Sequence, residues 1–148
     1  MEPTFRPVGP ADLEPFLELL GEMQAFFGNQ LHRRSAREAA RGLLENPAYG
    51  RAWFVEVGGE RAGYAVLALG YSLEFGGLDA FLDELFLRER FRGAGLGRKA
   101  MAFVEAEARA LGVQALHLEV ERDNRPALEL YRRIGYVDHD RFLMTKRL

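Results

Sequence analysis

Apolar residues recur along the first part of this chain with helical spacing. From Leu13 to Phe27 they return every three or four positions behind Asp12, which can cap a helix. Ser35 and Glu38 then have the spacing of a capping box ahead of a second apolar repeat, and Pro47 closes that repeat. The pattern therefore predicts two consecutive helices, the second one short.

Apolar or alternating runs elsewhere predict the strands of a sheet. The dipeptide Gly58-Gly59 separates two such runs and is typical of a tight hairpin turn. The predicted strands are Thr4–Val8, Ala52–Val57, Ala62–Leu69, Ala80–Leu87, Ala115–Val120, Tyr136–Asp138 and Arg141–Arg147.

A long amphipathic helix is predicted over Leu96–Leu111, with Gly112 past its C-terminus. It connects the strands predicted at 80–87 and 115–120, and a strand, crossover helix and strand in succession indicate a parallel pair. A last helix follows at Pro126–Ile134. The predicted fold class is α/β, of the α+β kind, with a mixed sheet and flanking helices.

Composition limits what this chain can be. A length of 148 residues and 48% hydrophobic residues predict a single domain over residues 1–148 with an adequate core. The formal net charge is only −2, so we expect no nucleic-acid partner. There is no cysteine, which excludes disulfides, thiolate metal ligands and a cysteine nucleophile.

Metal and membrane sites are not expected either. The histidines His32, His117 and His139 are scattered, without the spacing of metal ligands. No stretch approaches the roughly 18 uninterrupted apolar residues of a membrane span, and the first residues lack the features of a leader. We therefore expect no metal and no membrane segment, and a cytoplasmic location.

The most informative stretch runs from Glu84 to Lys99 and reads as a strand, a basic loop, a glycine run and a helix. Glycines let consecutive N–H groups converge, and the helix N-terminus adds its positive dipole end, so the stretch predicts a phosphate cradle. In a mononucleotide-binding loop the last glycine is followed by Lys and then Ser or Thr, which is not the case after Gly97. A dinucleotide-binding loop would need a glycine at position 98, which this chain lacks. Cationic donors surround the run: Arg88, Arg90, Arg92, Arg98 and Lys99.

Two motifs carry a resemblance to a known family. They are Arg92-x-x-Gly95-x-Gly97 and Asn124-x-x-Ala127-x-x-Leu130-Tyr131-x-x-x-Gly135-Tyr136. In these the chain resembles the GNAT superfamily of acyl-CoA-dependent N-acyltransferases, clearly from about Phe81 to Leu148. The resemblance implies a central, mostly antiparallel sheet with a splayed parallel strand pair, and acetyl-CoA as cosubstrate. The cofactor-binding residues it implies are Leu85, Phe86, Leu87, Arg92, Gly93, Ala94, Gly95, Leu96, Gly97, Arg98, Asn124, Ala127 and Tyr131.

Acetyl transfer to an amine needs a base, an oxyanion donor and an acid. Without cysteine, direct transfer in a ternary complex is the simplest mechanism. Asp83 and Glu84 are the candidate bases; we favour Glu84, and the alternative is that the carboxylates bind a positive charge or only end the strand. By resemblance the oxyanion donor is the N–H of Leu87. Tyr131 is the candidate acid; by spacing alone it would be a core aromatic residue. Asn124 can equally be a helix N-cap.

A small-molecule amine is the favoured acceptor because several acidic residues could make the acceptor region negative: Glu74, Asp83, Glu84, Glu119 and Glu121. A peptide N-terminus or protein lysine is the alternative, and so is a CoA-sensing module without turnover. The loop 28–34 with His32 and the loop Tyr71–Asp79 are candidate rims of the acceptor site. Whether the chain forms a homodimer is left open.

Overall fold

The computed structural model describes residues 2–28 and 33–148, so His32 lies outside the described residues. The chain forms two compact units, one up to Leu118 and one from Glu119 onward. The predicted single domain over residues 1–148 stays a prediction.

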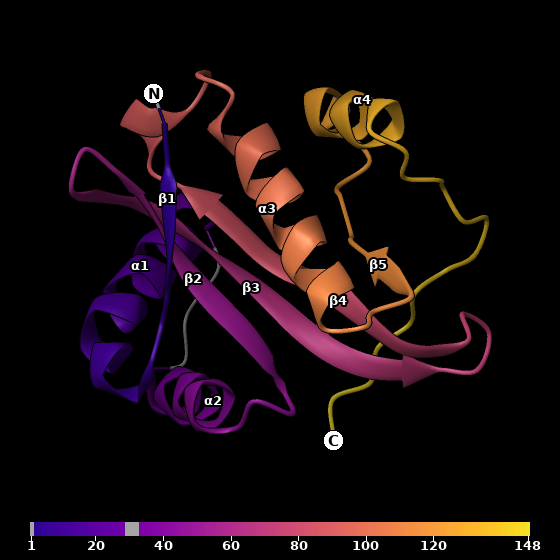
Figure 1. Ribbon diagram of the computed structural model, residues 1–148, viewed down its shortest axis with the longest axis horizontal. Helices are drawn as coiled ribbons and strands as arrows, with labels where there is room; N and C mark the ends of the chain where they lie inside the picture. Colours follow the sequence, from indigo (N-terminus) through magenta and orange to yellow (C-terminus); the bar gives the residue numbers. More distant parts are fainter. Residues whose placement is uncertain (1, 29–32) are drawn as a thin grey trace. The chain divides into compact units, whose positions relative to one another are not determined.

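The first unit contains a five-stranded sheet whose strands lie side by side in chain order (Figure 1). The strands are β1 (Thr4–Pro7), β2 (Gly50–Val57), β3 (Glu60–Ser72), β4 (Gly77–Leu87) and β5 (Ala115–His117). Neighbouring strands are antiparallel from β1 to β4, whereas β4 and β5 are parallel. The predicted mixed, mostly antiparallel sheet with one parallel pair is therefore confirmed.

Helices cover both faces of this sheet (Figure 1). The first face carries η1 (Pro10–Asp12), α1 (Leu13–Phe26) and α2 (Arg33–Glu45); the second carries α3 (Leu96–Ala110), which follows η2 (Glu89–Phe91). On the first face, the Phe16 ring meets Tyr64 edge-on at 5.5 Å. On the second, Phe103 stacks on Phe5 at 4.2 Å and meets Trp53 at 5.4 Å.

A β-bulge lies in the middle of β4. Leu67 of β3 is opposite Leu82, and the next residue, Val66, is opposite Glu84, so Asp83 is the extra residue. Beyond the bulge the alternation of faces is shifted by one position. Simple alternation along β4 would place Glu84 and Phe81 on different faces of the sheet. In the structure both lie on the same face, the one that α1 and α2 cover in part.

Several element boundaries differ from the sequence predictions, three of them in ways that change an assignment. Ser35 lies inside α2, which begins at Arg33, so it is not the N-cap. The predicted rim loop Tyr71–Asp79 is mostly paired strand, since β3 continues to Ser72 and β4 begins at Gly77. The strand predicted to reach Val120 ends at His117, because its pairing with β4 stops at Phe81.

The second unit contains α4 (Arg125–Arg133) and an irregular C-terminal segment. The strands predicted at 136–138 and 141–147 are wrong for this structure, in which neither segment is a strand. Alternating apolar residues form a strand only where a neighbouring strand accepts and donates the ladder hydrogen bonds. Here their side chains are exposed, as Val137 (79%), Phe142 (84%) and Met144 (88%) show.

Candidate active site

The C-terminal half of β4 has an open edge. In the first unit β5 pairs with β4 only over Asp79–Phe81, and β4 continues to Leu87 without a strand on that side. The N–H of Arg88 donates to Ala62 on β3 at 2.8 Å. Because successive N–H groups of a strand point in opposite directions, the N–H of Leu87 points to the open edge. This is the arrangement expected for a splayed pair.

The glycine run beside this edge forms a cradle of N–H groups. Gly93 and Gly95 have φ values of +76° and +79°, which favour glycine, and Gly95 is the N-cap of α3. Among the described residues, Lys99 is the first of the helix whose N–H donates to a backbone carbonyl, that of Gly95 at 3.2 Å. A Cβ added to Gly93, Gly95 or Gly97 would meet no atom within 4 Å. The cradle is thus open and fits a phosphate.

Most of the basic side chains near the cradle have protein partners. Arg88 donates to both carboxylate oxygens of Glu22 at 2.8 Å, and Lys99 donates to Glu2 at 2.6 Å. Arg90 forms an ion pair with Glu60. Of the five predicted cationic donors, Arg98 alone has no side-chain partner in the part of the chain that the structure describes. The backbone N–H groups are therefore the main donors that the cradle offers to an anion.

Arg92 ties the loop to the strand before it. Its Nε donates to the carbonyl of Leu87 at 2.8 Å, and its guanidinium lies 4.0 Å from the ring centre of Phe26 and 5.7 Å from that of Phe86. Planar guanidinium groups stack favourably on aromatic faces. The side chain of the matched arginine thus fixes the start of the loop against β4 and α1, which leaves its backbone for the ligand.

Glu84 is the half-buried carboxyl group of the site. The hydroxyl of Tyr64, on β3, donates to Oε2 of Glu84 at 3.2 Å. Burial raises the pKa of Glu84 to about 7, the charge of Asp83 adds to the rise, and the Tyr64 hydrogen bond opposes it. Asp83 is exposed. A carboxyl with a pKa near neutrality is suited to proton transfer, so the environment favours Glu84 over Asp83 as the base.

Tyr64 was not found from the sequence, although a signal was present. It is the one large polar side chain in a run of small apolar residues, and it is fully buried. A buried phenol needs a hydrogen-bond partner, and Glu84 is that partner here. Burial and the Glu84 charge raise the pKa of Tyr64 far above its usual value, so it stays a donor.

The second unit carries the other predicted site residues on α4. Asn124 is its N-cap, with Oδ1 accepting from the N–H of Ala127 at 3.4 Å, which confirms the capping role. The rings of Tyr131 and Tyr136 lie 5.9 Å apart. Burial raises the pKa of Tyr131, so its phenol is protonated near neutral pH.

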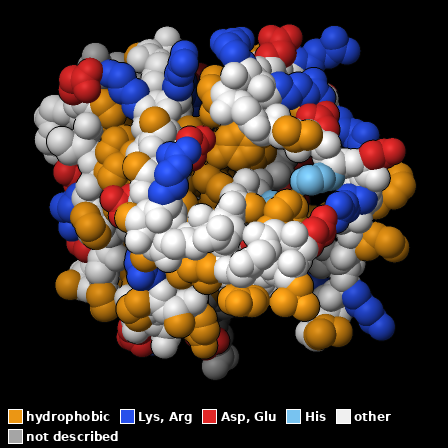
Figure 2. Space-filling model, turned by 45° about the vertical axis from the view of Figure 1, so that its right-hand side comes forward, with side chains coloured by type: hydrophobic (Ala, Val, Ile, Leu, Met, Phe, Trp, Pro, Cys, Tyr) orange, Lys and Arg blue, Asp and Glu red, His pale blue; other side chains and the backbone are white. Residues whose placement is uncertain are grey.

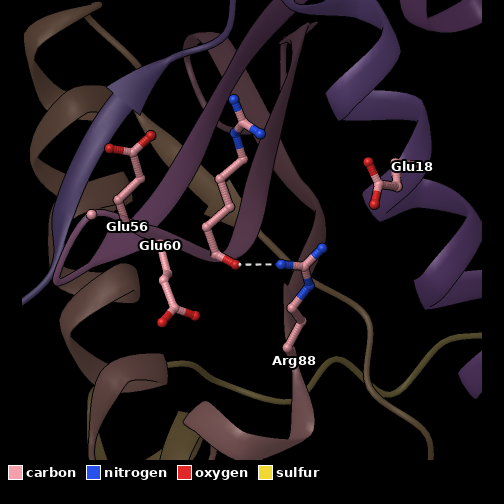
Figure 3. Close-up of a pocket in the computed structure, with 6 residues that line it drawn as sticks. Glu18, Glu56, Glu60 and Arg88 are labelled. Carbon is pink, nitrogen blue, oxygen red and sulfur yellow. Dashed lines mark hydrogen bonds between the residues drawn. The ribbon is translucent and has the colours of Figure 1, made fainter.

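The first unit also contains a cavity of about 360 Å³ (Figure 3). Its charged lining comes from α1, the β2–β3 hairpin and the end of β4: Glu18, Glu56, Glu60, Arg61 and Arg88. Arg88 there donates to the carbonyl of Arg61 at 2.9 Å. Arg88, one of the five predicted cationic donors, lines this cavity, whereas the candidate bases Asp83 and Glu84 do not. Within residues 2–28 and 33–148 there is also no cluster of three metal-ligating side chains and no helix able to span a membrane.

Known proteins share this sequence pattern and fold. The Acetyltransferase (GNAT) family model matches residues 16–136. The uncharacterized N-acetyltransferase YycN of Bacillus subtilis is 34% identical over 70 residues, which are 47% of this chain and 44% of YycN, so the match spans less than half of that relative.

Solved structures extend the likeness over the whole chain. An integron cassette protein from the mobile metagenome of Cole Harbour Salt Marsh is 35% identical, with a TM-score of 0.85, over 97% of this chain and 90% of its own. A predicted acetyltransferase of Clostridium acetobutylicum, solved with acetyl-CoA, is 15% identical; its TM-score of 0.81 over 98% of this chain and 96% of its own shows a shared fold. The extent of the family match shows that the chain belongs to the GNAT acetyltransferase family.

Proposed function

We propose that this chain is an N-acetyltransferase that moves an acetyl group from acetyl-CoA to a primary amine by direct transfer in a ternary complex. One observation carries the proposal: the strand β4 holds a half-buried carboxyl group whose pKa is raised to about 7, and the chain continues from β4 through η2 into an open cradle of N–H groups. A base and an anion site on one rigid element suit a reaction between an amine and a phosphate-bearing cosubstrate.

The cosubstrate supplies the thioester carbonyl. The cradle N–H groups from Gly93 to Arg98 would hold its pyrophosphate, and the N–H of Leu87 at the open edge would donate to the carbonyl oxygen as negative charge develops. Glu84 accepts the amine proton, directly or through water. Tyr131 returns a proton to the departing thiolate. No covalent intermediate on the protein is required.

A small-molecule amine is the proposed acceptor. Asp83 and Glu84 are adjacent acidic groups, and their negative charge attracts a cationic amine before the amine loses its proton. Peptide N-termini and protein lysines are the alternative acceptors. A CoA-sensing module is the alternative without chemistry, but the carboxyl and phenol groups that turnover needs are both present in this chain.

The direct test measures release of the CoA thiol from acetyl-CoA with a panel of polyamines, amino acids and short peptides. Glu84→Gln should lower kcat/KM by roughly 10²–10⁴ because it removes the base but keeps the shape. Asp83→Asn is the matched control and should be much milder, since that side chain is exposed. Near-normal activity in both variants would exclude a carboxylate base. Tight CoA binding without acetylation of any amine would favour the sensing module.

A further inference from the structure

Four side chains outside the proposed catalytic set lie together, three of them on one strip of the sheet and Phe75 in the turn between β3 and β4. They are Phe75, Asp79, Phe81 and His117. Phe81 is opposite Ala68 on β3 and beside His117 on β5, and Glu84 is opposite Val66. Ala68 and Val66 are two residues apart, so they point to the same face of the sheet. The bulge at Asp83 thus places Phe81, His117 and the proposed base on a single face.

A hydrogen-bonded pair stands at the far end of this strip. Nε2 of His117 lies 3.0 Å from Oδ2 of Asp79, and the two side chains are only 17% and 14% exposed. Gly70, opposite Asp79, makes room for this carboxylate, because a Cβ at that position would lie 2.8 Å from Oδ1. If Nε2 carries the proton toward Asp79, Nδ1 is an acceptor, and it has no partner among the described residues.

Aromatic rings flank the pair. The His117 ring lies 4.8 Å from Phe75 and 5.0 Å from Phe81, centre to centre. Phe81 is 39% exposed, and only the small side chain of Ala68 is opposite it. The exposed part of the Phe81 ring, beside the His117–Asp79 pair, can therefore stack on a flat ligand.

The spacing along the sheet sets the size of that ligand. Val66, Ala68 and Gly70 are opposite Glu84, Phe81 and Asp79, so these three lie in steps of two residues, about 7 Å each. From the base, one step reaches Phe81, with His117 beside it on β5, and two steps reach Asp79, the hydrogen-bond partner of His117.

We propose that this strip binds the distal part of the acceptor, and that the acceptor is an arylalkylamine whose ring bears a hydrogen-bond donor such as a hydroxyl group. The amine lies at Glu84, the ring on Phe81, and the ring hydroxyl donates to Nδ1 of His117. This inference rests on the proposed acetyl transfer and specifies its substrate class.

The test compares kcat/KM for tyramine, phenethylamine and 2-cyclohexylethylamine, which share the same spacer. We expect roughly a tenfold preference for phenethylamine over the cyclohexyl amine, and a further gain for tyramine. Phe81→Ala should remove the aromatic preference and Phe81→Leu should reduce it. His117→Asn should remove the tyramine gain alone. Tyr71→Ala is the control, because this residue is an exposed aromatic on the opposite face and should change neither ratio.

Calorimetric titration of the same amines into the CoA complex separates the two proposals. If no amine is acetylated, the proposed function fails, and weaker tyramine binding in Phe81→Ala than in Tyr71→Ala still supports the strip as a ligand site. Equal use and equal binding of the aromatic and cyclohexyl amines would overturn the inference. So would equal effects of Phe81→Ala and Tyr71→Ala, whatever the activity.

Discussion

At the scale of single residues, the hydrogen bond from Tyr64 to Glu84 has a measurable consequence. It stabilises the ionised carboxylate and so holds the pKa of Glu84 below the value that burial alone would give. Tyr64→Phe keeps the ring and removes the donor. The acidic limb of the pH profile of kcat/KM should therefore move to higher pH, by about one unit for a charge-assisted bond.

The control for this shift is Tyr49→Phe, which alters an exposed tyrosine and should leave the profile unchanged. Glu84→Gln should abolish the limb. A Tyr64→Phe enzyme with lower activity at every pH but an unmoved limb would mean that Tyr64 only supports packing. A limb that persists in Glu84→Gln would assign it to another group.

Tyr131 carries the second prediction at this scale. Tyr131→Phe keeps the ring contact with Tyr136 and removes the proton proposed for the thiolate. We expect kcat to fall by roughly 10²–10⁴ with little change in CoA affinity, as measured by single-turnover kinetics and calorimetry. An unchanged rate of the chemical step would reject the role, and an equal loss in Tyr136→Phe would point to a general effect on this unit.

At the scale of elements, the strand β4, the glycine run and α3 form the proposed phosphate site, and Gly95 tests it. Gly95→Val places a branched side chain at a φ of +79° beside the cradle. Gly112→Val places the same side chain at a φ of +85° beyond the other end of α3. Both should lower stability similarly, by about 1–3 kcal/mol.

Only Gly95→Val should weaken CoA binding, because only there does the side chain enter the space of the phosphate. Calorimetry with CoA on both folded variants checks this, after thermal melts have confirmed comparable stability. Equal CoA affinity in the two variants would remove the glycine run from the binding site.

The elements were largely predictable, and the exceptions have a common cause. The hairpin at Gly58-Gly59, the helix over 96–110 and the parallel pair follow from periodicity and turn residues. The bulge at Asp83 has no local signature, since it is a mismatch between two strands. Likewise, the partner of Glu84 lies 20 positions away on β3. Alternation within one strand therefore left the facing of Asp83 and Glu84 open.

The strands predicted near the C-terminus are wrong for a related reason: the pattern within one segment does not reveal whether a partner strand is present. Residues 141–147 have the composition of a strand, and yet a strand exists only with a partner. Apolar alternation predicts a tendency to pair, and the pairing itself is a property of two segments. The open cradle of N–H groups was predictable because all of its parts are consecutive in the sequence, and phosphate binding there stays a prediction.

At the scale of the whole molecule, the family match over residues 16–136 includes parts of both compact units. Acidic and basic side chains are intermixed on the face that Figure 2 shows, consistent with a formal net charge of only −2. With so little net charge, the pH dependence of stability should be governed by individual shifted groups rather than by general repulsion. Glu84 is the clearest such group.

Glu84 should make the protein less stable as pH rises. Its pKa is about 7 in the folded chain, against an ordinary value of 4.5, so between these values the unfolded chain loses the proton first. The cost is absent below pH 4.5, grows up to pH 7 and is constant above, where it reaches roughly 3 kcal/mol. Glu84→Gln should therefore be about as stable as the native protein at pH 4.5 and more stable by that amount at pH 8.

Urea unfolding at a series of pH values measures this difference. The single tryptophan, Trp53, is buried in the same unit as Glu84 and reports its unfolding by fluorescence. Asp83→Asn is the informative companion variant: it removes the smaller cause of the shift and leaves burial, so most of the decline should remain. Parallel stability curves for the native protein and Glu84→Gln would show that Glu84 has no raised pKa. The environment of β4 would then give no reason to prefer Glu84 over Asp83 as the base.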